Sequence, residues 1–130
     1  MKILILFLIM LPPFLLDGQN NQTIATKITL DEVMAKIPGK NGERYALGAS
    51  HGSMRLLTYA PRGKDDQKPH TQDEIYIVVK GKGEFISGSE KVKFKANDAL
   101  FVPAGQVHYF ENFSKDLMVW VVFWGKEGGE

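Results

Sequence analysis

Cysteine is absent from the 130-residue sequence, and this absence excludes several kinds of site. Without thiols the chain has no disulfide framework, no thiolate metal site and no cysteine nucleophile. Any metal must therefore be held by histidine, aspartate or glutamate side chains. Histidine is itself scarce, because the sequence contains only His51, His70 and His108.

A charge excess of either sign is also lacking. Sixteen Lys and Arg residues stand against fifteen Asp and Glu residues, and the formal net charge is +1. Such a balanced chain has no electrostatic preference for nucleic acid or for an anionic membrane. The sequence also has no glycine-rich phosphate loop and no nucleophile elbow. We therefore expect no nucleic-acid partner.

The amino-terminal residues 1–18 have the three-part layout of a secretory signal peptide. Lys2 precedes an apolar run at residues 3–11, two prolines follow the run, and a polar stretch starts at Asp17. The run is too short to span a bilayer comfortably, although a retained membrane anchor is the alternative. We expect a secreted or periplasmic protein with no stable membrane association after signal cleavage.

Residues 19–45 are predicted to form an arm and one short helix. Thr29 and Glu32 have the spacing of a capping box, and apolar residues follow at helical spacing as far as Ile37. Pro38 and Gly39 then end the pattern. This amphipathic helix should pack against the outside of the domain that follows.

Residues 46–125 predict one all-β domain, and residues 126–130 a C-terminal tail. Short β-prone runs alternate with turn residues at intervals of about ten residues, as in a sandwich or barrel. The predicted strands are residues 54–60, 74–80, 84–87, 91–95, 99–102, 107–112 and 117–124. No second long helical pattern occurs, which argues against βαβ units.

Two of these strands are apolar on both faces, residues 117–124 most clearly and residues 75–79 as well. One face of a barrel strand fills the interior, and the other face needs a cover. The short helix can cover part of it, and a second subunit in a homodimer can cover the rest. A thicker sandwich core is the alternative explanation.

A metal-binding pattern begins at His70, just before a strong strand. With the period of two that strands have, His70, Gln72 and Glu74 project on one face. Imidazole and carboxylate groups on one face can converge on a cation. His108 opens a later strand and is the obvious donor of a third ligand. Taken alone, a histidine at a strand entry is also typical of a structural or surface residue.

Both histidine segments resemble the motifs of the cupin superfamily. The first motif ends in H(x)3–4E(x)6G, and His70, Glu74 and Gly81 match that half. The second motif, from its proline onward, reads PxG(x)2H(x)3N, and Pro103, Gly105, His108 and Asn112 match it fully. The resemblance implies a double-stranded β-helix, a small jelly-roll barrel, that binds one divalent metal through His70, Glu74 and His108.

The chain departs from the family pattern at two positions. Lys68 stands where the first motif has another histidine, and Asn97 stands where the second motif has glycine. Asparagine tolerates left-handed turn geometry, so the second change is benign. Protonated lysine cannot bind a metal, so the first change reduces four protein ligands to three. Two imidazoles and one carboxylate suit Fe, Mn, Zn or Ni, and the spacing does not choose among them.

Further side chains are candidates for the pocket around that metal. Gln72 is a candidate auxiliary ligand, and Lys68 is either a rim residue that attracts an anion or a solvated lysine. Tyr76 and Phe110 share faces with the motif residues and line the cavity or pack the barrel. His51, in an expected turn, is a candidate general base or an uninvolved loop residue. The charges at residues 65–66 and 91–95 are expected to be solvated.

The predicted function is that of an exported single-domain cupin that binds one divalent metal. An open three-ligand metal suits dioxygenase-like or isomerase-like chemistry on a small organic molecule. The alternative is a non-catalytic module that binds metal or a small ligand, and a metal-free pocket also remains open. The sequence assigns no catalytic acid or base.

Overall fold

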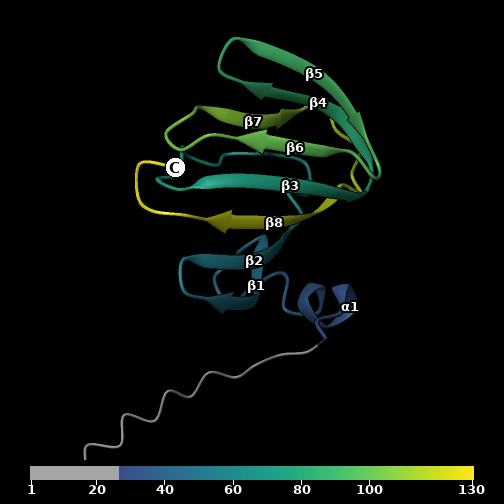
Figure 1. The fold of residues 1–130 in the computed structure, drawn as a ribbon. Coiled ribbons are helices and arrows are strands. Elements are labelled where there is room, and N and C mark those ends of the chain that lie inside the picture. The colour runs from purple at the N-terminus through teal and green to yellow at the C-terminus, as the bar shows by residue number, and fades with distance from the viewer. Residues whose placement is uncertain (1–26) are drawn as a thin grey trace, which may run out of the picture.

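The computed structural model describes residues 27–130, whose strands form two antiparallel sheets (Figure 1). The predicted signal peptide, residues 1–18, and residues 19–26 of the predicted arm lie outside the described residues. Between residues 27 and 130, no helix has the length and apolar character needed to cross a membrane.

The larger sheet has five strands, and the smaller sheet has three. In spatial order the larger sheet consists of β1 (Tyr45–His51), β2 (Met54–Tyr59), β8 (Met118–Trp124), β3 (Asp73–Lys80) and β6 (Ala99–Val102). The smaller sheet consists of β5 (Glu90–Lys95), β4 (Lys82–Ser87) and β7 (His108–Glu111). The predicted all-β barrel with a short N-terminal helix is therefore confirmed.

The hydrophobic core lies between the two sheets, where alternate residues of each strand meet. In β8 the inward residues Val119, Val121 and Phe123 are buried, and the residues between them are half-buried. Tyr76 of β3 contacts Phe110 of β7, with ring centroids 5.1 Å apart. The period-two pattern thus separates a filled interior from an outer face that is also largely apolar.

The short helix α1 (Leu30–Met34) starts as the sequence predicts. Thr29 and Glu32 form a complete capping box, in which each side chain accepts a hydrogen bond from the other residue's backbone N–H. The helix ends at Met34, earlier than the apolar spacing predicts. Ile37 is nevertheless buried beside Val33 and Ala46 in a small second core, which packs against the outer face of the larger sheet and includes half-buried Trp120.

All seven predicted strands are present, and the sequence analysis missed only β1 among the described strands. Its residues include Ala46, Gly48 and Ala49, which have low intrinsic strand propensity. Pairing with β2 supplies the missing stabilisation, and the register shifts between Leu47 and Ala49. His51 was expected in a turn, but it is the last residue of strand β1.

Candidate metal centre

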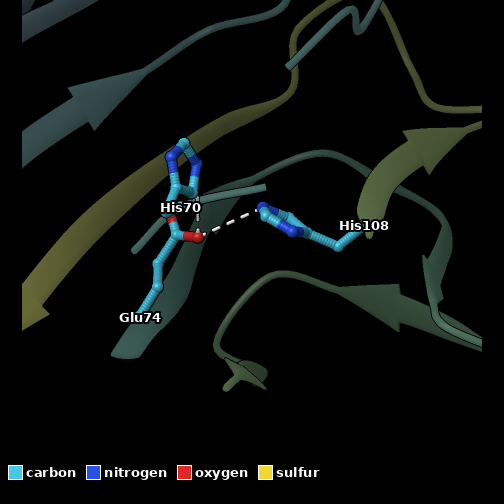
Figure 2. Close-up of side chains that lie close together, drawn as sticks. All are labelled: His70, Glu74 and His108. Carbon is cyan, nitrogen blue, oxygen red and sulfur yellow. Dashed lines mark ion pairs between the residues drawn. The ribbon is translucent and has the colours of Figure 1, made fainter. Parts of the chain in front are cut away.

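Three side chains from two segments of the chain converge at one end of the barrel (Figure 2). His70 precedes β3, Glu74 is in β3, and His108 is the first residue of β7. Their nitrogen and oxygen donor atoms all lie within 4.8 Å of one another. The structure thus brings together the three residues that the sequence analysis singled out as ligands.

Backbone contacts between the two motif segments explain this convergence. The N–H of Gly105 donates to the carbonyl of His70, with an N···O distance of 2.6 Å. The N–H of Ala104 donates to the Asp73 carboxylate at 2.9 Å. Gly105 has a φ of 77°, which a residue with a side chain rarely adopts. This turn therefore holds His108 opposite the start of β3.

The ring of His108 is oriented by a hydrogen bond on the side away from Glu74. Its Nδ1 lies 2.7 Å from the carbonyl oxygen of Gln106, which can only accept a hydrogen bond. Nδ1 therefore carries a proton, and Nε2 of the neutral ring presents its lone pair toward Glu74. Nε2 lies 3.2 Å from Glu74 Oε2 and 3.1 Å from the Tyr76 hydroxyl oxygen.

The pKa values of His70 and His108 are shifted in opposite directions from the ordinary histidine value. Burial lowers the pKa of His70, and the Glu74 carboxylate only partly offsets that effect. Burial also lowers the pKa of His108, but the Glu74 carboxylate and the Gln106 carbonyl outweigh it and raise the pKa above 6.5. The pKa values of the two histidines are thus shifted in opposite directions, although both side chains lie beside the same carboxylate.

Two donor atoms of this cluster are buried without a hydrogen-bond partner. They are Nε2 of His70 and Oε2 of Glu74, which lie 3.6 Å apart. Burying a polar atom without a partner costs about 1–3 kcal/mol. Folded proteins therefore usually satisfy such atoms with a protein group, water or an ion. Two orphaned atoms that face one point indicate a site built for a further partner.

A pocket of about 370 Å³ opens onto this cluster. Among the predicted pocket residues, Lys68 and Tyr76 line it, beside His70 and Glu74. The pocket's apolar wall includes Leu57, Val121 and Phe123. A small organic molecule fits a cavity of this size and lining.

Gln72 has a different position from the one the sequence analysis expected. Its amide nitrogen donates to the carbonyls of Gly125, at 2.7 Å, and Ser53, at 3.2 Å. Its amide oxygen accepts a hydrogen bond from Arg55 at 2.9 Å. With both ends of the amide bound to other groups, the assignment of Gln72 as an auxiliary metal ligand is wrong.

Phe110 and His51 also differ from the roles considered for them. Phe110 is packed in the core against Phe85, with ring centroids 5.0 Å apart, and is not among the described residues that line the pocket. His51 is exposed at the end of β1 and likewise does not belong to the pocket wall as described. The packing alternative therefore holds for Phe110, and the general-base role for His51 has no support.

The expectation that residue 65 is solvated is wrong, because the Asp65 carboxylate binds two residues that line the pocket, Tyr59 and Gln67. The carboxylate accepts hydrogen bonds from the Tyr59 hydroxyl at 2.7 Å, the Gln67 amide at 2.8 Å and the Phe110 N–H at 2.7 Å. Gln67 in turn accepts the Tyr76 hydroxyl proton at 2.9 Å. This chain links a loop carboxylate to the tyrosine that contacts His108.

Asp66 is exposed, as expected, and it also forms an ion pair with Arg44. Four polar residues that line the pocket were not expected from the sequence: Tyr45, Arg55, Tyr59 and Gln67. Arg55 and Tyr59 alternate with Leu57 on β2, and this period of two could have placed them on one face. Gln67 lies in an irregular segment and had no such signal.

Comparison with known proteins agrees with this geometry. The family model described as "Cupin domain" matches residues 55–124, which is more than half of the sequence. The chain is a cupin. Asn97 of this cupin has a φ of 72°, so the residue that replaces the motif glycine adopts the expected left-handed conformation.

Three proteins illustrate what this chain is similar to. An uncharacterized protein of Streptomyces coelicolor is 46% identical over 95 residues, covering 72% of this chain and 90% of that protein. The acireductone dioxygenase of Geobacillus kaustophilus is 28% identical over 103 residues, covering 74% of this chain and 56% of that enzyme. A cupin 2 conserved barrel domain protein from Salinispora arenicola has a TM-score of 0.59 at 23% identity, covering 78% of this chain and 90% of that one.

Proposed function

We propose that this cupin binds one divalent metal through His70, Glu74 and His108 and acts on a small organic molecule. The observation that carries the proposal is the pair of orphaned donor atoms, which face each other beside the pocket. A cation between the three side chains would satisfy both atoms. A network built only for hydrogen bonding within the protein would leave neither of them unpaired.

The donor set fits a first-row divalent metal such as Fe, Mn, Zn or Ni. Bonds of about 2.0–2.2 Å at tetrahedral or octahedral angles place neighbouring donor atoms about 3.0–3.5 Å apart. The 3.2 Å and 3.6 Å separations from Glu74 Oε2 are close to that range. The Gln106 carbonyl beside His108 Nδ1 is the outer hydrogen bond that metal-binding histidines usually have.

Three protein ligands would leave coordination positions toward the pocket. Lys68, at the motif position of a fourth ligand, is exposed at the pocket wall. A metal held in this way supplies Lewis-acid or oxygen-activating chemistry, as in two-histidine-one-carboxylate sites. The likeness to a dioxygenase at 28% identity supports the dioxygenase-like reaction over an isomerase-like one.

The protein's own contribution is to shape and dry the space beside the cluster. Leu57, Val121 and Phe123 exclude water from one wall. Burial and the nearby Glu74 charge raise the pKa of Tyr76 well above its usual 10. Tyr76 therefore keeps its proton, donates it to Gln67 and holds its oxygen toward His108.

A non-catalytic binding cupin is the second candidate, and one observation favours it. The hydroxyl protons of Tyr59 and Tyr76 are both given to protein acceptors, Asp65 and Gln67. Burial raises the pKa of both tyrosines, so neither is a good acid at neutral pH. Tyr59 and Tyr76 are thus not well placed to donate a proton in turnover.

The experiment that separates the two functions uses the full chain loaded in turn with Fe, Mn, Ni or Zn. Oxygen uptake and substrate loss are measured across small enols, thiols and oxo-acids. An enzyme is expected to turn over at least one compound with one metal, and Lys68→His should slow it while tightening metal binding. Tight metal binding without any turnover would favour the binding module.

Metal affinity is expected to fall with decreasing pH. Metal and proton compete for His108 Nε2, and the pKa of His108 is raised, so the loss should start above pH 6.5. Below that pKa the apparent affinity should drop by about tenfold per pH unit for one displaced proton. Competition titrations with a chromogenic chelator between pH 8 and 5 measure this apparent metal affinity. A flat profile would contradict histidine ligation.

We also propose that two copies form a homodimer through the outer face of the larger sheet. A row of cross-strand partners runs over β2, β8, β3 and β6, and its members are Leu56, Val122, Ile75 and Phe101. Phe101 is 56% exposed. Such an apolar row suits an isologous interface, in which the same surface is buried on both subunits.

Light scattering at micromolar concentration should give twice the mass of the mature chain. Phe101→Asp places a charge on the most exposed residue of this row, at the edge strand β6, and should shift the protein to monomer. Tyr109→Asp is the matched control, because Tyr109 is an exposed aromatic residue on the smaller sheet. If the wild-type protein is monomeric, the homodimer proposal is wrong and the outer face of the larger sheet is exposed to solvent.

A further inference from the structure

The described pocket wall has two positive charges without an ion-pair partner, whereas its negative charges are paired. Arg55 and Lys68 line the pocket and are both exposed. Asp66 also lines it, but its charge is paired with Arg44. The Glu74 charge is directed at the two histidines. No carboxylate among residues 27–130 forms an ion pair with Arg55 or Lys68.

Arg55 is held in place although it is exposed. Its guanidinium carbon lies 4.7 Å from the ring centroid of Phe123, its cross-strand neighbour on β8. One nitrogen donates to Gln72, whose own amide is bound to the Gly125 and Ser53 carbonyls. Fewer rotamers remain to be lost on binding, so a carboxylate can meet a preorganised guanidinium.

Arg55 stands close to the candidate metal centre. The Phe123 ring that carries the guanidinium also contacts the His70 ring, with centroids 4.8 Å apart. A molecule a few bonds long can therefore contact Arg55 at one end and the cluster at the other.

The two buried hydroxyl groups of the pocket, those of Tyr59 and Tyr76, do not compete for this role. Tyr59 and Tyr76 donate their protons to Asp65 and Gln67, so their oxygens are left mainly as acceptors. An anionic group in the pocket would find its charged donors in Arg55 and Lys68. A neutral molecule could accept hydrogen bonds from both cations but would lack the charge–charge attraction.

We propose that the pocket binds a small organic acid, with its carboxylate on Arg55 and its other end directed at His70, Glu74 and His108. Lys68 adds long-range attraction at the rim. The assignment rests on the proposed use of this pocket as the ligand site. It gives Gln72, rejected as a metal ligand, a positioning role for Arg55.

The test compares butyrate with butyramide, which has nearly the same shape but no charge. Calorimetric titrations use metal-free and zinc-loaded full-length protein, since zinc is redox-inert. Wild-type protein is expected to bind butyrate at least tenfold more tightly than butyramide in both forms. Arg55→Gln should abolish the discrimination in the metal-free form and leave metal content unchanged. Arg62→Gln, which removes the same charge outside the described pocket wall, should change nothing.

Lys68→Gln should weaken butyrate binding by severalfold at low ionic strength and by little at 0.3 M salt, because an exposed charge is screened. Gln72→Ala should reduce the discrimination while Arg55 remains present. In the metal-free form, equal affinities for butyrate and butyramide, or discrimination that survives Arg55→Gln, would overturn the assignment. Metal binding is scored separately, so a failed anion site and a failed metal site give different results.

Discussion

His70→Ala and His108→Ala are each expected to reduce bound metal from one ion per chain to nearly none. Each variant removes one of three ligands, and a site with two protein ligands left should lose at least a hundredfold in affinity. Metal analysis after dialysis, on protein purified without a histidine tag, measures the stoichiometry. A competition titration then gives the affinity.

The two variants differ in their risk to folding. His108 is 2% exposed, so its replacement leaves a cavity, whereas the His70 side chain is 32% exposed. His70→Ala therefore separates loss of metal from loss of fold, which circular dichroism can verify. His51→Ala is the matched control, because this histidine lies on the exposed end of β1. One ion per chain retained by folded His70→Ala would disprove the assigned site.

Gly81→Ala is expected to cause the largest loss of stability among the glycine variants considered. Gly81 has a φ of +96°, and an added Cβ would lie 2.8 Å from both Leu117 Cα and Ser114 Oγ. The positive φ costs about 1–2 kcal/mol, and the backbone overlap adds about 1–3 kcal/mol. Together these losses are a large part of the free energy of unfolding, which is about 5–15 kcal/mol for a typical domain. Urea unfolding followed by tryptophan fluorescence measures the change.

Gly52→Ala provides the control for Gly81→Ala. Gly52 also has a positive φ, +56°, but an added Cβ meets nothing within 4 Å. Its loss should stay near the 1–2 kcal/mol of the backbone conformation alone. Equal losses in the two variants would show that the contact with residues 114 and 117 does not matter. If Gly81→Ala fails to fold while Gly52→Ala folds, the packing explanation stands.

The strands and the ligand cluster were largely predictable because both depend on short-range patterns. Alternation and turn residues located seven of the eight described strands. The spacing of His70 and Glu74 puts both donors at one strand start, and the match to the second motif identifies His108 as their partner. Capping chemistry is equally local, so Thr29 and Glu32 predicted where α1 begins.

The predictions that were wrong or incomplete share a physical cause. Each concerns a feature that depends on contacts between residues far apart in the sequence. β1 exists because β2 supplies its hydrogen-bond partners, although Gly48 and its alanine neighbours disfavour a strand. Asp65 is a loop carboxylate in the sequence, yet it accepts the N–H of Phe110, 45 residues away. No periodicity in the sequence reports such a contact.

The sequence by itself determined the fold class, the family and the three donor residues, because these follow from local spacing and residue chemistry. Only the tertiary structure decided how the polar side chains around them are used. Gln72 shares the alternation of His70 and Glu74, but the carbonyls of Ser53 and Gly125 bind its amide and turn it toward Arg55. A buried amide adopts the orientation in which all its hydrogen bonds form, and the partners of Gln72 lie far from it in the sequence.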